Sequence, residues 1–320
     1  MSDPTVSVLM PTYNAARYLA EAIESILQQT WKDLQLVVLD GGSTDPTEDI
    51  VRAYAKRDDR IKFESFPDRH PCARLDEYIP TLKSRFIAIQ HADDVSYRNR
   101  IARQLRAFVE DSDLSVCSVL VKSFAHQRMQ AGIQDGTYIH MRPAAHAAIK
   151  ANLPFWWVMH CPTYMFDREK ITRAGMKFSN DYLYCNDYWQ TVTHIDRLKY
   201  HNIQEPLAAY RLHVDSDGLK NQDRVRAEER KIKTESLRHF GFEFTPREAE
   251  IHGAFRMLPD GILDAKTPED FEEILLWLKK LKEQNDDLGV FDRTEFADLA
   301  ENLEDLTRQK MNMGAKATGT

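Results

Sequence analysis

Short apolar runs that end in polar turns dominate the first hundred residues. Runs at residues 6–10, 34–39 and 86–89 are nearly continuous in apolar residues, which is typical of strands buried on both faces of a parallel sheet. Between the first two runs, apolar residues recur at helical spacing: Leu19, Ala22, Ile23, Ile26 and Leu27. This strand–helix–strand order predicts a mostly parallel sheet flanked by helices.

The later part of the chain changes character near residue 220. Before it, the pattern predicts a strand at 114–121, a helix that opens at Asn186, and a closing segment at 210–213. After it, charged helix formers dominate, and Thr245 and Thr267 each precede a Pro at a predicted helix start. We therefore expect an α/β domain at 1–220, a helical C-terminal domain at 221–311 and a disordered tail at 312–320.

Polar side chains follow each of the early apolar runs. Tyr13 and Asn14 come after the first run and Asp40 after the second, while Asp93 and Asp94 come after the third. The turns after parallel strands share one edge of a sheet and build one site. An aromatic ring there can stack on a base, an upstream Arg74 can pair with phosphate, and adjacent carboxylates can hold Mg²⁺ or Mn²⁺. The plain alternative for the Asp pair is a solvated turn that caps the next helix.

Composition narrows the class of protein. The 320 residues carry a net charge of −7, which gives no overall attraction for nucleic acid. The four Cys form no CxxC pair, the N-terminus lacks a signal-peptide pattern, and no apolar run is long enough to span a membrane. We expect a cytoplasmic protein, at most peripheral at the inner face of a membrane.

Five segments, in order, resemble glycosyltransferase family 2, whose members have the nucleotide-sugar-binding A-type glycosyltransferase fold. The resemblance covers residues 1 to about 218. Its segments are the opening strand with its turn at 6–14, the second strand end at 39–45, Arg74, the motif at 91–94, and Asn186–Asp187 with the segment at 210–213. Each segment alone is a weak signal, but all five occur in the family's order.

The resemblance implies a role for each matched position. Pro11, Tyr13 and Asp40 would line the nucleoside pocket, with Arg74 near the base or the phosphates. Asp93 would contact ribose or metal. The metal ligands would be Asp94, Asp93 and His213, and the catalytic base would be Asp187. The implied reaction is a metal-dependent, inverting transfer of a sugar from a nucleoside-diphosphate sugar to an acceptor hydroxyl, in bacterial surface glycan or glycoconjugate synthesis.

Three positions depart from the family pattern. Gly41 replaces a second Asp at the second strand end, which removes one expected base contact. His91 begins the metal motif where Asp is frequent, and we interpret it as a residue that shapes the turn rather than a ligand. Asn186 replaces the Glu that often precedes the catalytic Asp. These departures keep open a non-catalytic nucleotide-sugar-binding module of the same fold.

The first strand's turn and a late apolar stretch bear on two different hypotheses. A nicotinamide-dependent oxidoreductase would need a G-x-G-x-x-G turn after the first strand, and the sequence there is Pro-Thr-Tyr-Asn. The apolar stretch at 275–280 could contact a membrane that carries a lipid-linked acceptor, or pack on the catalytic domain or in a homodimer. The acceptor class remains open among glycan, lipid-linked and protein hydroxyls.

Overall fold

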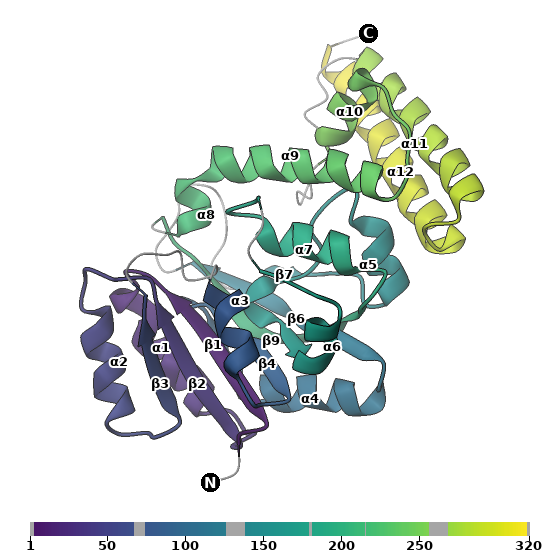
Figure 1. Ribbon diagram of the computed structural model, residues 1–320. Helices are drawn as coiled ribbons and strands as arrows, with labels where there is room; N and C mark the ends of the chain where they lie inside the picture. The colour runs from purple at the N-terminus through teal and green to yellow at the C-terminus, as the bar shows by residue number, and fades with distance from the viewer. Residues whose placement is uncertain are drawn as a thin grey trace. The chain divides into compact units, whose positions relative to one another are not determined.

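The structure is a computed structural model, and it describes residues 3–66, 74–125, 138–178, 181–214, 216–255 and 268–318. Four parallel strands form one half of its sheet, in the order β3-β2-β1-β4 (Figure 1). Their bounds are β1 Val6–Thr12, β2 Leu34–Asp40, β3 Ile61–Ser65 and β4 Phe86–Ile89. The apolar runs at 6–10, 34–39 and 86–89 thus predicted β1, β2 and β4 and their parallel direction correctly, because a strand buried on both faces is readable from a continuous run.

The other half of the sheet has mixed directions. Strand β8 (Met165–Asp167) pairs antiparallel with both β4 and β6 (Leu114–Ala125). The long strand β9 (Lys199–Leu212) then pairs parallel with β6 and antiparallel with the short β5 (Val95–Ser96). As a result, the end of β9 returns to the turn that follows β4.

One segment without a clear hydrophobic pattern contains a strand. Within 127–146, which shows no clear periodicity, β7 (Tyr138–His140) pairs antiparallel with β6. Residues 126–137 lie outside the described residues. A three-residue strand is too short to produce a periodic signal, so only its partner strand defines it.

Helices pack on one face of the sheet. Helix α1 (Ala16–Leu27) and helix α4 (Arg100–Glu110) contribute to one buried apolar cluster with alternate residues of the strands. That cluster includes Val8, Leu36 and Ala88 from the sheet. Since successive strand residues point to opposite faces, these three lie on the same side.

The other helical segments of the α/β part are short. They are α2 (Thr47–Ala55), α3 (Leu75–Tyr78), η2 (Ile79–Thr81), η3 (Cys161–Thr163), α6 (Arg168–Arg173), α7 (Asn186–His194) and α8 (Asp217–Lys220). The sequence pattern at 73–82 predicts a helix, and within its described part the structure has one α-helical turn, α3, followed by the 3-10 turn η2.

The predicted cap of the second helix is wrong. The pattern Asp45-Pro46 predicts Asp45 as the N-cap, but α2 begins at Thr47 and Pro46 is its cap residue. Asp45 instead accepts a hydrogen bond from the backbone N–H of Thr47 at 3.1 Å and another from Ala16 at 3.0 Å. Its carboxylate therefore also satisfies a backbone donor in the first turn of α1, a partner that sequence spacing cannot reveal.

Contacts divide the chain into two compact units. The first has Met1–Ala144, Met159–Gln190 and His194–Lys220, and the second has Ala145–Val158, Thr191–Thr193 and Asn221–Thr320. The second unit contains α5 (His146–Asn152), α9 (Gln222–His239), α10 (Pro246–Gly253), α11 (Pro268–Leu288) and α12 (Arg293–Thr318). The helical backbone of α12 thus extends into the stretch for which the sequence predicts a disordered tail.

The helical unit has an aromatic core. Phe155 packs against His252 and Phe255, with ring centroids 5.0 and 5.2 Å apart. Trp277 and Leu278 of α11 are buried, whereas Leu276 is 69% exposed. Two residues of the apolar stretch at 275–280 are therefore used in the core of this unit.

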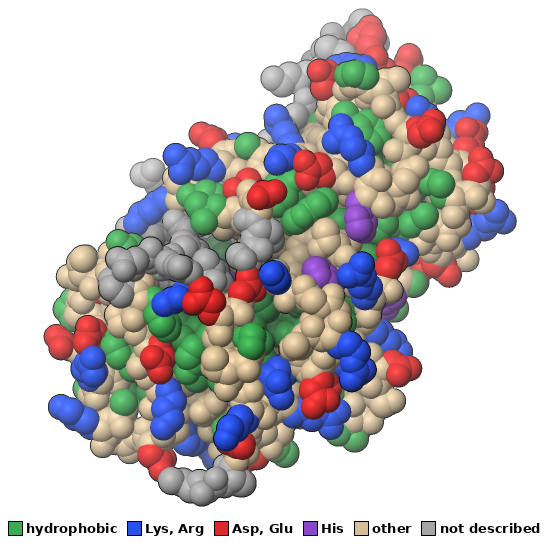
Figure 2. Space-filling model, viewed as in Figure 1, with side chains coloured by type: hydrophobic (Ala, Val, Ile, Leu, Met, Phe, Trp, Pro, Cys, Tyr) green, Lys and Arg blue, Asp and Glu red, His purple; other side chains and the backbone are tan. Residues whose placement is uncertain are grey.

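Of the two helix starts predicted at Thr245 and Thr267, the structure describes the first. Thr245 forms the predicted capping box with Glu248, whereas Thr267 lies outside the described residues. Among the helices in the described segments, none has both the length and the apolar composition of a membrane span. Positive and negative side chains are interspersed on the face shown in Figure 2.

Candidate active site

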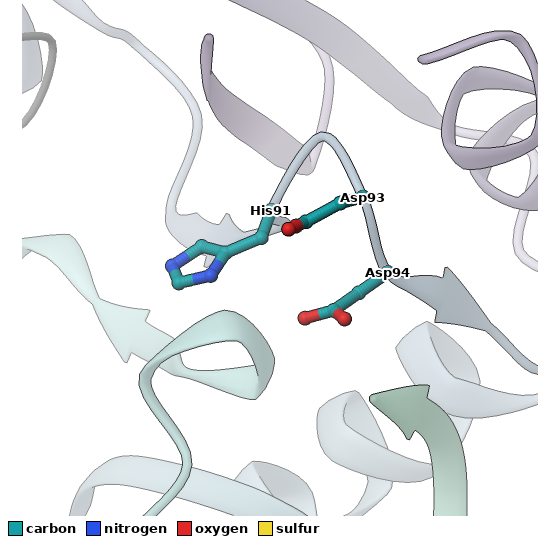
Figure 3. Close-up of side chains that lie close together, drawn as sticks. All are labelled: His91, Asp93 and Asp94. Atoms are coloured by element: carbon teal, nitrogen blue, oxygen red, sulfur yellow. The ribbon is translucent and has the colours of Figure 1, made fainter. Parts of the chain in front are cut away.

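Three potential metal ligands lie on the turn between β4 and β5. One ligand atom each from His91, Asp93 and Asp94 lies within 4.8 Å of the others. Figure 3 shows the three side chains projecting from the same side of this turn. The turn has this position because β4 ends at Ile89 and the chain reverses before β5 begins at Val95.

One carboxylate oxygen of Asp94 is hydrogen-bonded, and the other has no hydrogen-bond partner among the described residues. Its Oδ1 accepts a hydrogen bond from the backbone N–H of Arg211 at 2.9 Å. Its Oδ2 is buried without a hydrogen-bond partner among the described residues, and the side chain is only 4% exposed. Burial, and then the charge of Asp93, raise the pKa of Asp94 well above its ordinary value. Because a buried unpaired carboxylate oxygen is costly, this atom fits a cation ligand.

Asp93 is paired with His213. The Asp93 Oδ2 and the His213 Nε2 are 3.0 Å apart, and the His213 ring lies 4.7 Å from the Tyr18 ring. Burial alone would raise the pKa of Asp93, but the hydrogen bond with His213 and the charges of His91 and His213 bring it below the ordinary value. The structure therefore brings His213 to the predicted site, and its role as a metal ligand stays a prediction.

His91 has a larger part in the geometry than the sequence interpretation gives it. Burial lowers the pKa of His91, which favours the neutral imidazole that binds metals. Together with two carboxylates it provides a nitrogen and two oxygens, a donor set that suits Mn²⁺ better than Mg²⁺, which prefers oxygen ligands. Its place at the start of the motif is the sequence signal for this position.

Arg211 has no role in the sequence prediction, although it stands beside His213. Its Nε donates to the backbone oxygen of Asp93 at 2.8 Å, and its side chain is 3% exposed. The guanidinium lies between the rings of Tyr18 and Phe124, 4.5 and 4.4 Å from their centroids, and pairs with Glu21 at 2.5 Å. Arg211 thus fixes both Asp residues of the turn through its main chain and side chain.

Asp40 organises its own turn. Its Oδ2 accepts from the backbone N–H groups of Gly42 and Ser43, each at 2.9 Å, and its Oδ1 accepts from the Ser43 hydroxyl. Gly42 has φ +83°, a conformation that glycine adopts without strain. The Asp40 carboxylate therefore stabilises the turn that follows its own strand. A contact between Asp40 and a nucleoside stays a prediction.

The turn after β1 is bound to the turn after β2. Asn14, in the left-handed region with φ +48°, accepts a hydrogen bond from the Thr44 N–H at 2.8 Å. Its own N–H donates to the Ser43 hydroxyl at 2.8 Å. Next to it, Tyr13 is 59% exposed, and Pro11 pairs with Leu39 in the sheet. The ring of Tyr13 is therefore available for stacking at the tip of a fixed turn.

Arg74 and Asp187 lie at helix starts. The Arg74 guanidinium lies 4.1 Å from the Phe66 ring and pairs with Glu77, and its Nε is buried without a hydrogen-bond partner in the described part of the chain. Asp187 is in the first turn of α7, where its Oδ1 accepts from the Tyr188 N–H at 3.0 Å. Their roles toward phosphate and acceptor stay predictions.

The fold and this site together indicate the class of protein. The polar turns after β1, β2 and β4 follow parallel strands at one edge of an α/β sheet, and the turn after β4 carries a His–Asp–Asp group. The family model "Glycosyl transferase family 2" matches residues 7–171. The chain belongs to this family, and its enzyme class is that of the glycosyltransferases. The predicted A-type fold with C-terminal helices is confirmed.

Relatives at the sequence level carry similar names. An uncharacterized glycosyltransferase of Haemophilus influenzae is 25% identical over 246 residues, which are 74% of each chain. A Bacillus subtilis protein, TuaG, whose name assigns it provisionally to teichuronic acid biosynthesis, is 29% identical over 180 residues, 54% of this chain and 66% of its own. Some relatives are much longer, and the match spans 25% of one from Rickettsia conorii.

Solved structures share the fold at low identity. S. aureus TarS, residues 1–349, in complex with UDP-GlcNAc, has a TM-score of 0.56 and 15% identity, covering 96% of this chain and 92% of the other. The mannosyltransferase PcManGT of Pyrobaculum calidifontis, in complex with GDP-Man and Mn²⁺, has a TM-score of 0.52 and 20% identity. It covers all of this chain and 82% of its own.

Proposed function

We propose that this protein is an inverting, metal-dependent glycosyltransferase that moves a sugar from a nucleoside-diphosphate sugar to an acceptor hydroxyl. The observation that carries the proposal is the buried Oδ2 of Asp94, which has no hydrogen-bond partner among the described residues and lies within a group of three ligands. The complexes of similar folds with UDP-GlcNAc, or with GDP-Man and Mn²⁺, support the same class of donor.

The turn after β4 would hold the metal. Asp94 and Asp93 supply oxygens and His91 supplies a nitrogen, while His213 orients Asp93 or joins the ligands. A divalent cation at this place would neutralise charge on the departing diphosphate. Arg74 would pair with a phosphate oxygen, and Tyr13 would stack on the base while Asp40 keeps its turn rigid.

Asp187 would act as the base. As the acceptor oxygen forms its bond to the anomeric carbon, the Asp187 carboxylate takes the hydroxyl proton, and the bond from that carbon to the diphosphate oxygen breaks with its electron pair on the diphosphate. One displacement inverts the anomeric centre. The Asn186 side chain does not compete for that proton, because a carboxamide is not a base. Its oxygen accepts from the N–H of Asp187 at 2.8 Å and its NH₂ group donates to the carbonyl of Phe178 at 2.9 Å.

We also propose a class of acceptor and a cellular location for this enzyme. The name of TuaG supports a bacterial surface glycan as the acceptor, either free or lipid-linked. We place the enzyme in the cytoplasm, where nucleotide sugars are available, with peripheral membrane contact through the exposed Leu276 as one way to meet a lipid-linked acceptor. Co-sedimentation with anionic vesicles tests the contact, and sedimentation velocity tests a homodimer formed through the helical unit.

The experiment is a donor screen by thermal shift with Mn²⁺ and with Mg²⁺. A ligand that binds the native state raises the melting temperature, and a hundredfold excess over Kd stabilises by about 2.7 kcal/mol. We expect a shift with one group of UDP- or GDP-sugars only when metal is present, and no metal-dependent shift in Asp94→Asn. A transfer assay with the identified donor follows. Binding without transfer or hydrolysis would favour the non-catalytic module, and the lack of a shift with every donor would contradict the proposal.

A further inference from the structure

A fully buried arginine lies behind the His91–Asp94 turn. Arg100, the first residue of α4, is 0% exposed. Its Nη1 donates to the Gln90 side-chain oxygen at 2.9 Å and to the Ser96 hydroxyl at 2.7 Å. Its Nη2 donates to the Ile89 carbonyl at 2.5 Å, and its Nε to the Gln104 oxygen at 3.1 Å. These four partners are neutral oxygens, so the charge lies among dipoles rather than in a direct ion pair with any of them.

The arginine determines how Gln90 is oriented. The Gln90 oxygen accepts from Arg100 and also from the Ser96 hydroxyl at 2.6 Å. With its oxygen so occupied, the amide must direct its NH₂ group the other way. That group donates to the backbone oxygens of His91 and Asp94, each at 2.9 Å. A single side chain therefore ties together both ends of the turn that carries the candidate ligands.

We propose that Arg100 and Gln90 are positioning residues that hold the His91–Asp94 turn in its metal-binding geometry. This inference rests on the proposed metal-dependent function. A metal site needs ligand atoms fixed to within about 0.5 Å, and a backbone turn without supporting bonds does not provide that precision. Arg100 acts on the turn through Gln90, whereas Arg211 bonds to it directly, so two separate sets of bonds support it.

The decisive variant is Gln90→Glu. A glutamate keeps the acceptor for Arg100 and turns that contact into a charge-assisted bond, which strengthens the link to Arg100 itself. Its second oxygen, however, would face the carbonyl oxygens of His91 and Asp94 and repel both. The substitution therefore keeps the contact with Arg100 and removes the contact with the turn. The added negative charge by itself would strengthen binding of a cation, so a simple charge effect and a positioning effect have opposite signs.

Binding of Mn²⁺ alone, followed by electron paramagnetic resonance of the free ion, is the main measurement, with the melting temperature measured in parallel. Loss of a supporting partner typically weakens metal affinity by about 10- to 100-fold. We expect Gln90→Glu to raise the Mn²⁺ Kd by a factor in that range, and the melting temperature measured in parallel shows whether the variant is folded at the temperature of the binding experiment. Gln28→Glu, which adds the same charge on an exposed position, is the matched control and should leave the Kd unchanged.

Arg100→Lys gives an independent measurement. A lysine keeps the charge but has no planar fork to hold Gln90 and the Ile89 carbonyl together, so we expect an intermediate loss of Mn²⁺ affinity. Arg103→Lys, at a more exposed position of the same helix and paired with Glu205, is its control. If Gln90→Glu folds poorly, Arg100→Lys decides the question.

The outcomes separate the two proposals. If wild type binds Mn²⁺ and the Gln90 and Arg100 variants bind it equally well or more tightly, the positioning role is refuted and the proposed function is untouched. If wild type itself does not bind Mn²⁺, the metal-dependent function fails, and the positioning role fails with it.

Discussion

Acid should destabilise the helical unit through a single buried histidine. His252 of α10 is 0% exposed, and its Nε2 lies 2.8 Å from the Pro154 carbonyl oxygen. The indole N–H of Trp277 donates to its Nδ1 at 3.1 Å. Since an indole nitrogen is only a donor, Nδ1 must accept and Nε2 must carry the proton. The neutral ring is therefore fully satisfied, whereas a protonated ring would direct a hydrogen at the indole N–H.

The magnitude follows from the pKa of this group. Burial lowers the pKa of His252 from 6.5 to about 3, and the nearby charge of Lys233 contributes in the same direction. In the unfolded chain the ring takes up a proton below pH 6.5, whereas in the folded chain it does so only near pH 3. The contribution of His252 to the free energy of unfolding is therefore complete above pH 6.5. It is lost progressively as the pH falls from 6.5 toward about 3. At pH 5, about 1.5 pH units below the unfolded pKa, the loss is about 2 kcal/mol.

Urea unfolding at pH 8 and pH 5 measures this loss against His252→Gln. Glutamine can accept from the indole and donate to the carbonyl but does not titrate. We expect the fall in unfolding free energy between the two pH values to be about 2 kcal/mol smaller in the variant. Hydrogen exchange in α10 and α11 locates the effect in the helical unit. Equal pH dependence in the variant and in wild type would refute the reasoning.

Three further predictions concern residues of the first compact unit. Asp187→Asn should lower kcat by about 10²- to 10⁴-fold with the donor Kd unchanged, since only the proton acceptor is lost; a near-normal kcat in a steady-state assay would exclude Asp187 as the base. Removal of metal with EDTA should abolish transfer and readdition of Mn²⁺ should restore it, while Asp94→Asn should not be restored; full activity in EDTA would contradict a metal requirement. Asp45→Ala should cost about 1 kcal/mol in thermal unfolding, because it leaves backbone donors of two helix starts unsatisfied; Asp49→Ala, on the exposed face of α2, is the control.

Much of the α/β half was predictable for a local reason. Continuous apolar runs and turn residues report on the few residues around them, so β1, β2 and β4 and their polar ends could be read directly. The same holds for the capping box at Thr245, whose two bonds span three residues. The family motifs are also local strings, which is why they locate the His91–Asp94 turn without tertiary information.

The remaining half depended on pairings between distant residues. The reversed strand β8 and the short β5 and β7 carry too few residues for a periodic pattern, and their directions come from their partners. The second partner of Asp45, the backbone N–H of Ala16, lies 29 positions away, so no local pattern reveals it.

The sequence by itself determined the class of fold, the family and the residues that could supply ligands. Only the tertiary structure decided which of them meet and what holds them there. Arg211 reaches Asp94 across 117 positions of the chain, and His213 reaches Asp93 across 120. Arg100 has the sequence context of an ordinary helix-surface charge and is fully buried behind the turn. A side chain's partners depend on where the sheet folds back, and strand β9 returning beside β5 is a long-range event that no short stretch of sequence encodes.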